Sequence, residues 1–491
     1  MGESKAVAFR PRLRGVEAAA GGLLPGGQGR PLPASHGPSR AAKIHSGRAH
    51  GNLLAFRTDD LLVLATMVHF PLNPRPVEPR LAPRFQELLV TDPPAEDDPR
   101  TEERAQALLD DAVQWKASDI HIEPGSAETR LRLRIDGVLH DVAAVPNYFG
   151  HRLVAFFKTL SEIDATAVAR PEHGHGRMAS GATLMELRTT VAPTADGEMV
   201  GIRLLDTLRP VLRLDQLGIP EIDQTRLATW LEGMQGMLLV CGPAGSGKTS
   251  TLYSLLHQLQ VLPRSTVTVE DPVESHIEGI TQLQVNPKRG LTFPEAIRAM
   301  LRLDPDFLLV GEIRDPESAH VAIRAAGTGL TILSTIHARD AVGAVTALRN
   351  NGVKDWEISA ALEVCICQRL VRRLCPSCRC RAPLTDEDRH WLSMAGKPPP
   401  EILWTSKGCD ACAGTGFEGR IGVFEIWTVD AEARQLILQG ADGAPLARHA
   451  LAHGTQPLLH DAIEKVMDGL TSLSEIRFLS GHGIHASLDP A

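Results

Sequence analysis

Residues 242–249 read Gly242-Pro-Ala-Gly-Ser-Gly-Lys248-Thr249, and this octapeptide decides the expected fold. It matches the pattern G-x-x-x-x-G-K-[ST], in which a glycine-rich loop lets backbone N–H groups close around phosphates. The apolar run MLLVC at 237–241 precedes the loop, and the helical pattern TSTLYSLLHQLQ at 249–260 follows it. A strand before the loop and a helix after it are the context that such a phosphate loop requires. We therefore predict a nucleotide-binding α/β domain.

The loop also predicts which residues bind ATP and Mg²⁺. Lys248 is expected to contact the β- and γ-phosphates, and the Thr249 hydroxyl is expected to hold the metal ion. A glycine turn that matches the pattern by chance is the alternative. The predicted phosphate-binding residues are Gly242, Gly245, Ser246, Gly247, Lys248, Thr249 and Ser250.

Three further apolar runs, at 265–270, 307–312 and 330–337, alternate with segments of helical length. This alternation predicts a mainly parallel sheet with helices on both faces. We place this domain at 214–491. Ligand sites in such sheets lie beyond the carboxyl ends of the strands, so side chains that follow the runs should converge on the phosphate loop.

Acidic residues end two of these runs. Glu270 and Asp271 follow the first run and Glu312 ends the second, where a Walker B strand usually ends in Asp. One acid is needed to organise Mg²⁺ and its waters, and another to orient or deprotonate the attacking water. His337 ends the third run, where it is either a hydrogen-bonded structural residue or a sensor of the γ-phosphate.

The cysteines predict a metal site. Cys375, Cys378, Cys409 and Cys412 form C-x₂-C…C-x₂-C, a pattern in which four thiolates bind structural Zn²⁺ tetrahedrally. The gap of about 30 residues between the pairs is longer than in a common zinc ribbon, so we expect an insertion at about 370–420. Cys380 is a competing ligand, and free thiols without metal are the alternative.

Composition limits the remaining regions. With 43% hydrophobic residues, 22% charged residues and a net charge of −8, the chain is typical of a globular protein without specific nucleic-acid binding. We expect the Pro- and Gly-rich residues 1–100 to be disordered or poorly defined, and we find no secretory signal or membrane span, which favours the cytoplasm. Period-two runs at 120–139 and 185–205 after a helical pattern at 103–115 predict a small α+β domain over 101–213.

Several segments together resemble the ATPases of type II secretion and type IV pilus assembly. They are GPAGSGKTSTLY, TVEDPVE, LRLDPDFLLVGEIRD, STIHARDA, QRLVRRLCPSC and CDACAGTGFEGRIGVFEI, while ASDIHIEP and RIDGVL resemble the domain that precedes the motor in that family. The resemblance covers about residues 105–480. It implies a RecA-like motor that forms a homo-hexamer with ATP at the subunit interfaces.

Residue roles are carried over from this resemblance. Glu270 would be the catalytic base, Glu312 would support Mg²⁺ through water, and His337 would be the sensor. In that family arginines of the preceding domain act across the interface, and the candidates here are Arg170, Arg177 and Arg203. The segment PEHGHGR at 171–177 is longer than its family counterpart, and the family's N-terminal docking domain is not recognisable in residues 1–100.

The resemblance implies a hexameric motor that hydrolyses ATP to assemble a secretion pseudopilus or a pilus. It would act from the cytoplasm, peripheral to the inner membrane, through a platform protein in that membrane. The alternative is a homologue that binds nucleotide but serves as a catalytically weak scaffold or regulator. Pilus retraction and conjugative motors are disfavoured by the four-cysteine element.

Overall fold

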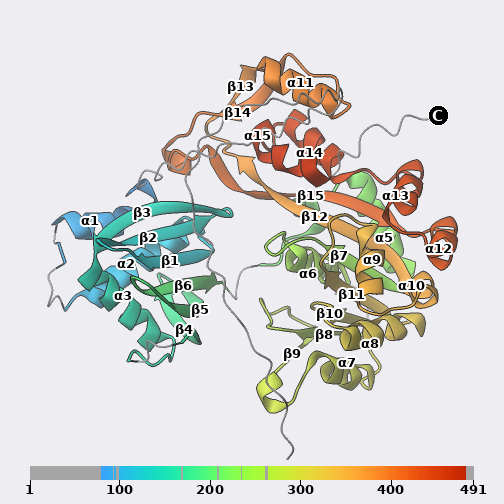
Figure 1. Ribbon diagram of the computed structural model, residues 1–491, viewed down its shortest axis with the longest axis horizontal. Coiled ribbons are helices and arrows are strands. Elements are labelled where there is room, and N and C mark those ends of the chain that lie inside the picture. Colours follow the sequence, from blue (N-terminus) through green and yellow to red (C-terminus); the bar gives the residue numbers. More distant parts are fainter. Residues whose placement is uncertain are drawn as a thin grey trace, which may run out of the picture. The chain divides into compact units, whose positions relative to one another are not determined.

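The computed structural model describes residues 79–91, 93–94, 99–166, 170–206, 210–233, 235–259 and 264–482 (Figure 1). Most of the expected disordered region at 1–100 lies outside these residues. Within it, however, a short 3₁₀ turn at Pro79–Leu81 leads into helix α1, Pro83–Thr91, whose Phe85 is buried. The expectation of a poorly defined segment is therefore wrong for residues 83–91, because apolar side chains there pack against the following helix. No helix in the described ranges combines the length and apolarity needed to span a bilayer.

The expected α+β region contains a six-stranded antiparallel sheet with strand order β3-β2-β1-β6-β5-β4. Its strands are β1 Asp119–Pro124, β2 Glu128–Ile135, β3 Val138–Pro146, β4 Glu172–Ser180, β5 Thr183–Thr194 and β6 Gly197–Leu205. Helices α2, Thr101–Gln114, and α3, Asn147–Leu160, pack against it. Asp136 and Gly137 join β2 to β3 with φ values of 49° and 85°. Positive φ at both central residues is the geometry of a type I′ hairpin turn, which explains the Asp-Gly pair.

A seven-stranded sheet carries the phosphate loop, with strand order β15-β12-β7-β11-β10-β8-β9. Its strands are β7 Met237–Cys241, β8 Thr266–Glu270, β9 Thr281–Gln284, β10 Phe307–Val310, β11 Thr331–Ile336, β12 Leu362–Leu374 and β15 Phe417–Thr428. All neighbours are parallel except β12 and β15. The predicted mainly parallel sheet is thus confirmed.

Helices cover both faces of this sheet (Figure 1). One face meets α4 Leu214–Leu217, α5 Glu221–Gly233 and α6 Lys248–Leu259, whereas the other meets α7 Phe293–Leu301, α8 Pro316–Gly327, α9 Gly343–Asn350 and α10 Asp355–Ala361. The chain ends with α12 Ala431–Leu438, α13 Gly443–Ala452, α14 Leu458–Met467, α15 Leu473–Ile476 and the 3₁₀ turn Arg477–His482.

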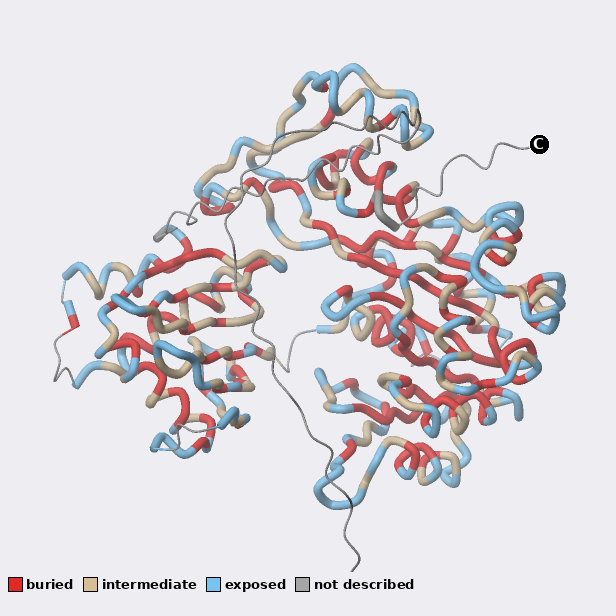
Figure 2. Tube along the Cα trace, in the orientation of Figure 1, coloured by how far each residue is buried: buried red, intermediate tan, exposed pale blue. Residues whose placement is uncertain are grey.

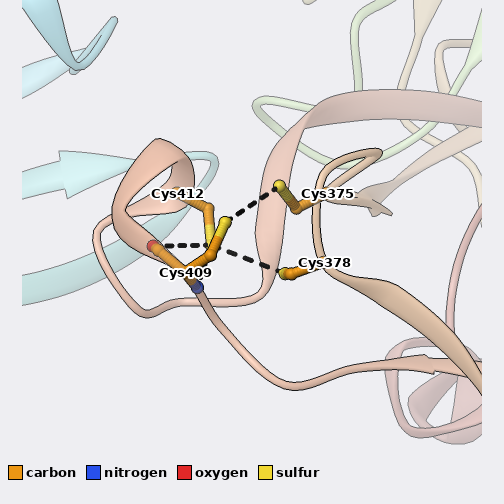
Figure 3. A group of neighbouring side chains, drawn as sticks. All are labelled: Cys375, Cys378, Cys409 and Cys412. Carbon is orange, nitrogen blue, oxygen red and sulfur yellow. Dashed lines mark hydrogen bonds between the residues drawn. The ribbon is translucent and has the colours of Figure 1, made fainter.

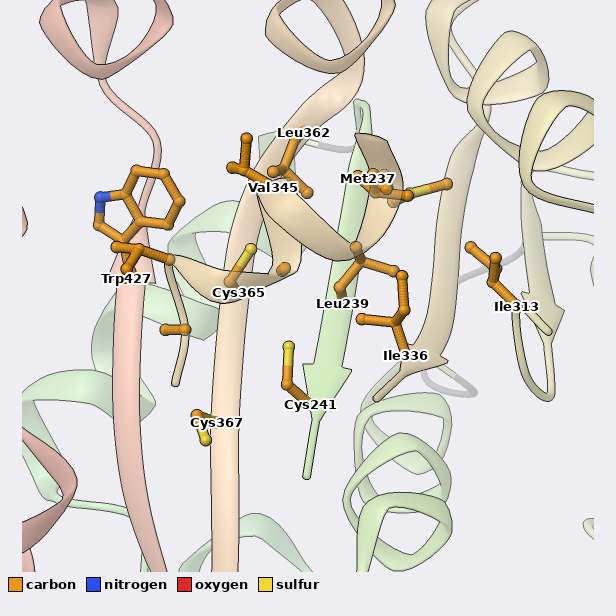
Figure 4. Close-up of a cluster of buried hydrophobic side chains, with 14 of the residues drawn as sticks. Met237, Leu239, Cys241, Ile313, Ile336, Val345, Leu362, Cys365, Cys367 and Trp427 are labelled. Atoms are coloured by element: carbon orange, nitrogen blue, oxygen red, sulfur yellow. The ribbon is translucent and has the colours of Figure 1, made fainter. Parts of the chain in front are cut away.

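The sequence of strand β7 is apolar at every position because both of its faces are buried. Met237, Leu239 and Cys241 point into one buried cluster (Figure 4), whereas Leu238 and Val240 belong to a second cluster that includes α6. All five side chains are fully buried, as the tube of Figure 2 shows for the central strands. Successive strand residues face opposite sides, so a strand with helices on both sides must be apolar at every position.

The long gap between the cysteine pairs is filled by a separate substructure. After β12 the chain forms β13, Arg379–Pro383, helix α11, Asp386–Met394, and β14, Ile402–Ser406, before the 3₁₀ turn Asp410–Cys412. Strands β13 and β14 pair antiparallel in a sheet of their own. The expected insertion at about 370–420 is therefore a hairpin with one helix.

Candidate functional site

The carboxyl ends of β7, β8, β10 and β11 open into a cleft of about 820 Å³. Parallel strands end at the same sheet edge, so residues far apart in sequence meet there. Residues from each strand end and from the phosphate loop line it, among them Ala244, Lys248, Thr249, Glu270, Glu312 and His337. The predicted convergence of the acids and the histidine on the phosphate loop is thus seen in the structure.

The phosphate loop depends on glycine at two close approaches. Gly242 has φ +151°, and a Cβ there would lie 2.5 Å from the Ser246 Oγ. Gly247 has φ +88°, and its Cβ would lie 2.8 Å from the Gln368 Nε2. Because a larger residue would both strain the backbone and clash, the sequence must keep glycine at these positions.

The loop residues fit a bound phosphate. Lys248 Nζ donates to the backbone carbonyls of Gly242 and Pro243, at 2.9 and 3.1 Å. Burial lowers the pKa of Lys248, whereas the negative charge of Glu312 opposes that shift. Ser246 Oγ is buried without a hydrogen-bond partner among the described residues. Among the described residues this ammonium bonds only to its own loop, so together with the unpartnered hydroxyl it can donate hydrogen bonds to an anionic oxygen. Ser250, by contrast, is exposed and does not line the cleft.

Glu270 is held rigidly in the cleft wall. Its carboxylate accepts hydrogen bonds from Tyr253 Oη at 2.5 Å, Thr268 Oγ1 at 2.5 Å and Gln282 Nε2 at 3.2 Å. The residue is only 3% exposed. A carboxylate has about four acceptor positions, so three donors leave about one position for a water molecule. This geometry can orient one water and accept its proton.

Glu312 faces the histidine at the next strand end. Glu312 Oε1 lies 2.8 Å from His337 Nε2, and His337 Nδ1 lies 3.1 Å from the Gly242 carbonyl oxygen. A carbonyl oxygen only accepts, so His337 donates from Nδ1. Arg314 Nε contacts the second oxygen of Glu312. The histidine therefore connects the phosphate loop to the acid of β10.

Tyr253, Glu274 and Arg314 also line the cleft, although the sequence analysis did not single them out. Tyr253 lies in an apolar stretch of α6 and resembles a core residue, yet its hydroxyl bonds to Glu270 and accepts the backbone N–H of Glu274 at 3.2 Å. Glu274 also hydrogen-bonds to Thr249, and burial together with nearby Glu270 raises its pKa. Arg314 lies in the segment GEIRD and Glu274 in TVEDPVE, so a charged residue close to Glu312 or Glu270 was the available signal.

The three candidate arginines are all exposed, but only one reaches the cleft of its own chain. Arg203 on β6 lines the cleft, together with Arg188 on β5, and its Nε lies 3.3 Å from Asp119 Oδ1. Arg170 is 3.6 Å from Glu172, and Arg177 lies on β4 opposite Glu186 of β5. Neither Arg170 nor Arg177 is among the residues that line the cleft.

The four predicted cysteines form one cluster (Figure 3). Their sulfur atoms all lie within 4.8 Å of one another, and the Sγ atoms of Cys375 and Cys409 are 3.9 Å apart. Cys375 and Cys378 come from the turn after β12, whereas Cys409 directly precedes the 3₁₀ turn before β15 and Cys412 ends it. Cys380 lies on β13 and is not part of this cluster, so it is not a competing member.

The cluster fits a tetrahedral metal with four sulfur ligands. Burial opposes ionisation of Cys412, but the backbone N–H groups of Cys409 and Gly416 donate to its sulfur, each at 3.2 Å, and lower its pKa to about 7. Such N–H donors stabilise metal-bound thiolates. Cys241, Cys365 and Cys367 lie outside this cluster and are buried, and burial raises the pKa of each thiol.

Comparisons with known proteins show which sequences and structures the chain resembles. A sequence model of the family "Type II/IV secretion system protein" matches residues 94–478. The type II secretion system protein E of Aeromonas hydrophila is 36% identical over 394 residues, which are 80% of this chain and 77% of that protein. The type IV pilus assembly ATPase PilB of Myxococcus xanthus is 38% identical over 390 residues, covering 78% of this chain and 68% of that protein. The ATPase DotB of Legionella pneumophila shares the fold, with a TM-score of 0.57 at 20% identity over 79% of this chain and 98% of that chain.

Proposed function

The chain belongs to the type II/IV secretion system protein family, and from that membership we propose that it is an ATP-hydrolysing motor for a type II secretion pseudopilus or a type IV pilus. One observation carries the proposal: the phosphate loop, Glu270, Glu312 and His337 line a single cleft at the carboxyl edge of the sheet. The interior position of β7, between β12 and β11, supports a RecA-like domain over 214–491, with the six-stranded region at 101–213 as a second domain.

We propose distinct roles for the two acids. Glu270 is the catalytic base, because its three donors fix it while leaving about one acceptor position for the attacking water. Glu312 is engaged by His337 and Arg314, so it suits the indirect support of Mg²⁺ instead. Lys248 and Thr249 would hold the phosphates and the Mg²⁺ ion, which neutralises charge that develops on the transferred phosphoryl group.

The four-cysteine cluster would bind structural Zn²⁺, because four thiolates within reach of one ion are its preferred closed site. The zinc would join the two ends of the β13–α11–β14 hairpin to the sheet. Its role is to hold this insertion in place, away from the residues that line the ATP cleft.

The assembly is proposed from the family. We propose a homo-hexamer in which Arg170 and Arg177, which do not line the cleft of their own chain, act on the nucleotide of a neighbouring subunit. We also propose that the motor acts at the inner membrane through a platform protein. Molar mass by light scattering with and without ATP tests the hexamer, and a particle that stays monomeric in both conditions contradicts it.

Mg-dependent ATP hydrolysis of the purified chain tests the enzyme, with Glu270→Gln and Lys248→Ala as variants. We expect Glu270→Gln to bind ATP with unchanged affinity while hydrolysis falls about 10²–10⁴-fold, the usual worth of a general base. Lys248→Ala should lose nucleotide binding. If wild-type protein binds ATP but is as slow as Glu270→Gln even with a platform protein added, the scaffold alternative replaces the motor.

A further inference from the structure

Helices α12 and α13 follow each other near the end of the chain and pack together (Figure 1). The turn before α12 supplies Asp430, and α13 together with its C-cap supplies His449 and His453. One ligand atom from each of these three residues lies within 4.8 Å of the other two. The cluster shares no residue with the four-cysteine site or with the ATP cleft.

His449 is the unusual member of this cluster. Its side chain is only 5% exposed, and neither ring nitrogen has a hydrogen-bond partner among the described residues. Its Nε2 nevertheless lies 3.3 Å from Asp430 Oδ1 and 3.6 Å from Glu432 Oε2. Buried polar side chains normally form hydrogen bonds, so an unpartnered imidazole aimed at two carboxylates calls for a ligand between them.

His453 presents the nitrogen that a metal needs. Its Nδ1 lies 2.9 Å from the His449 backbone carbonyl oxygen, which only accepts, so Nδ1 carries the proton and Nε2 keeps its lone pair. That Nε2 lies 3.6 Å from Glu432 Oε2, the same oxygen that faces His449. A hydrogen bond from the second ring nitrogen to a carbonyl is the usual orientation of a metal-bound histidine.

The sequence spacing of the two histidines supports a shared ion. His449 and His453 are four residues apart, which places both side chains on one face of the helix, as in metal motifs with two helical histidines. Their rings stack with centroids 4.0 Å apart and planes 18° apart, so one ring has to turn for both Nε2 lone pairs to point at one ion. Asp430 Oδ1 also accepts the backbone N–H of Ala433 at 2.8 Å, which fixes the carboxylate at the start of α12.

We propose that Asp430, His449 and His453, with Glu432 as the fourth ligand, form a second transition-metal site, suited to Zn²⁺. Two imidazoles with two carboxylates are a zinc donor set, whereas Ca²⁺ and Mg²⁺ prefer oxygen ligands alone. The ion joins the start of α12 to the end of α13. Each of these two helices contacts the hydrophobic core through one face only. The ion therefore adds a direct link between them.

Zinc stoichiometry of the full chain tests this site. After dialysis against zinc and removal of the excess, we expect two zinc ions per wild-type chain. His453→Gln and Asp430→Asn should each leave one and weaken binding of the second at least about 10-fold, the smallest usual effect of changes around a metal. Both variants should fold, because His453 is 48% exposed and asparagine caps a helix as well as aspartate.

Matched variants separate the two sites. Cys409→Ser should also leave one zinc ion, but the remaining ion should then be lost on further substitution of His453 by glutamine. Cobalt replacing that ion should show no thiolate-to-metal absorption band. His257→Gln, an exposed histidine on α6, should keep both ions. A wild-type chain that holds a single zinc ion, or variants of His453 and Asp430 that hold two with wild-type affinity, would overturn the proposal.

Discussion

Glu312 Oε1 and His337 Nε2 lie 2.8 Å apart at the ends of the neighbouring strands β10 and β11. The other nitrogen of His337 contacts the carbonyl of Gly242, the first residue of the phosphate loop. One side chain thus touches both the loop and the acid proposed to support Mg²⁺. The arrival or loss of a γ-phosphate at the loop would therefore shift Glu312 through this histidine, and a change at Glu312 would likewise shift the loop.

His337→Ala is therefore expected to lower kcat about 10²-fold, because a preorganised group beside the transferred phosphoryl is worth about 10²–10³ in kcat. The affinity for ATP should change less than about 3-fold, since Lys248 and the loop N–H groups remain. Steady-state hydrolysis and fluorescent-nucleotide binding provide both numbers. His257→Ala, on the exposed side of α6, is the control and should behave as wild type. An unchanged kcat in His337→Ala would leave this histidine a purely structural role.

Tyr253 is expected to position Glu270. Tyr253→Phe removes only the hydroxyl that donates to Glu270 and accepts from the Glu274 backbone. Without it the carboxylate gains freedom, and small misplacements of a reacting group cost up to about 10²-fold in rate. We expect kcat to fall about 10-fold or more while the Kd for ATP and the melting temperature stay near wild type.

The other tyrosine of the chain supplies the control for this experiment. Tyr148 Oη donates to the Pro94 carbonyl in the six-stranded region, far in sequence from the phosphate loop. Tyr148→Phe should keep kcat. If Tyr253→Phe instead raises KM and leaves kcat intact, then the hydroxyl serves binding and not the position of the base.

Much of the ATP cleft and of the cysteine cluster could be predicted from short stretches of the sequence. The phosphate loop has its own strand and helix, and the acids at 270 and 312 each end an apolar run, so the parallel sheet alone brings them together. The metal site of the cysteine pairs could be predicted because two cysteines separated by two residues can both bind one ion. These features need only neighbours in the chain and one assumption about strand direction.

Other features depend on long-range packing and left no local signal. The sequence does not state that β11 lies between β7 and β10, nor that Tyr253 on α6 turns its hydroxyl to β8. His449 lies 19 residues after Asp430, and only the packing of α12 on α13 brings them together. Helix α1 was not predicted from the sequence, because proline-rich stretches flank it. In the structure its Phe85 is buried in the core.

The cysteine cluster is expected to stabilise the insertion by binding zinc. Cys409→Ser should lower the zinc content by one ion per chain and lower the melting temperature, because metal binding at a structural site contributes directly to folding. Elemental analysis and a thermal melt measure the two effects. Cys380→Ser is the matched control, since Cys380 lies in the same insertion but outside the cluster. Equal zinc content in the two variants would speak against the site.

The buried pair of Asp461 and Lys465 on α14 gives a stability prediction with a defined pH dependence. Both side chains are about 95% buried, in direct contact, and Asp461 Oδ2 also accepts the Phe424 backbone N–H at 2.7 Å. Lys465→Met leaves a buried carboxylate without its cation, so the free energy of unfolding should fall by about 3–5 kcal/mol at pH 7. Asp461→Asn/Lys465→Met should recover part of that loss, because the amide oxygen still accepts from Phe424.

The sign of the pH effect follows from burial, which raises the pKa of Asp461 above its usual 3.8 while the charge of Lys465 opposes the shift. In Lys465→Met that opposition is gone, so the folded state binds the Asp461 proton more tightly than the unfolded state. Its stability should therefore decline as pH rises through the raised pKa and recover toward pH 3.8. Urea unfolding at several pH values measures this, with the exposed pair Lys397–Glu464 as control: Lys397→Met should cost at most about 1 kcal/mol. A deficit in Lys465→Met that stays constant from neutral to acidic pH would mean that Asp461 is not the group left uncompensated.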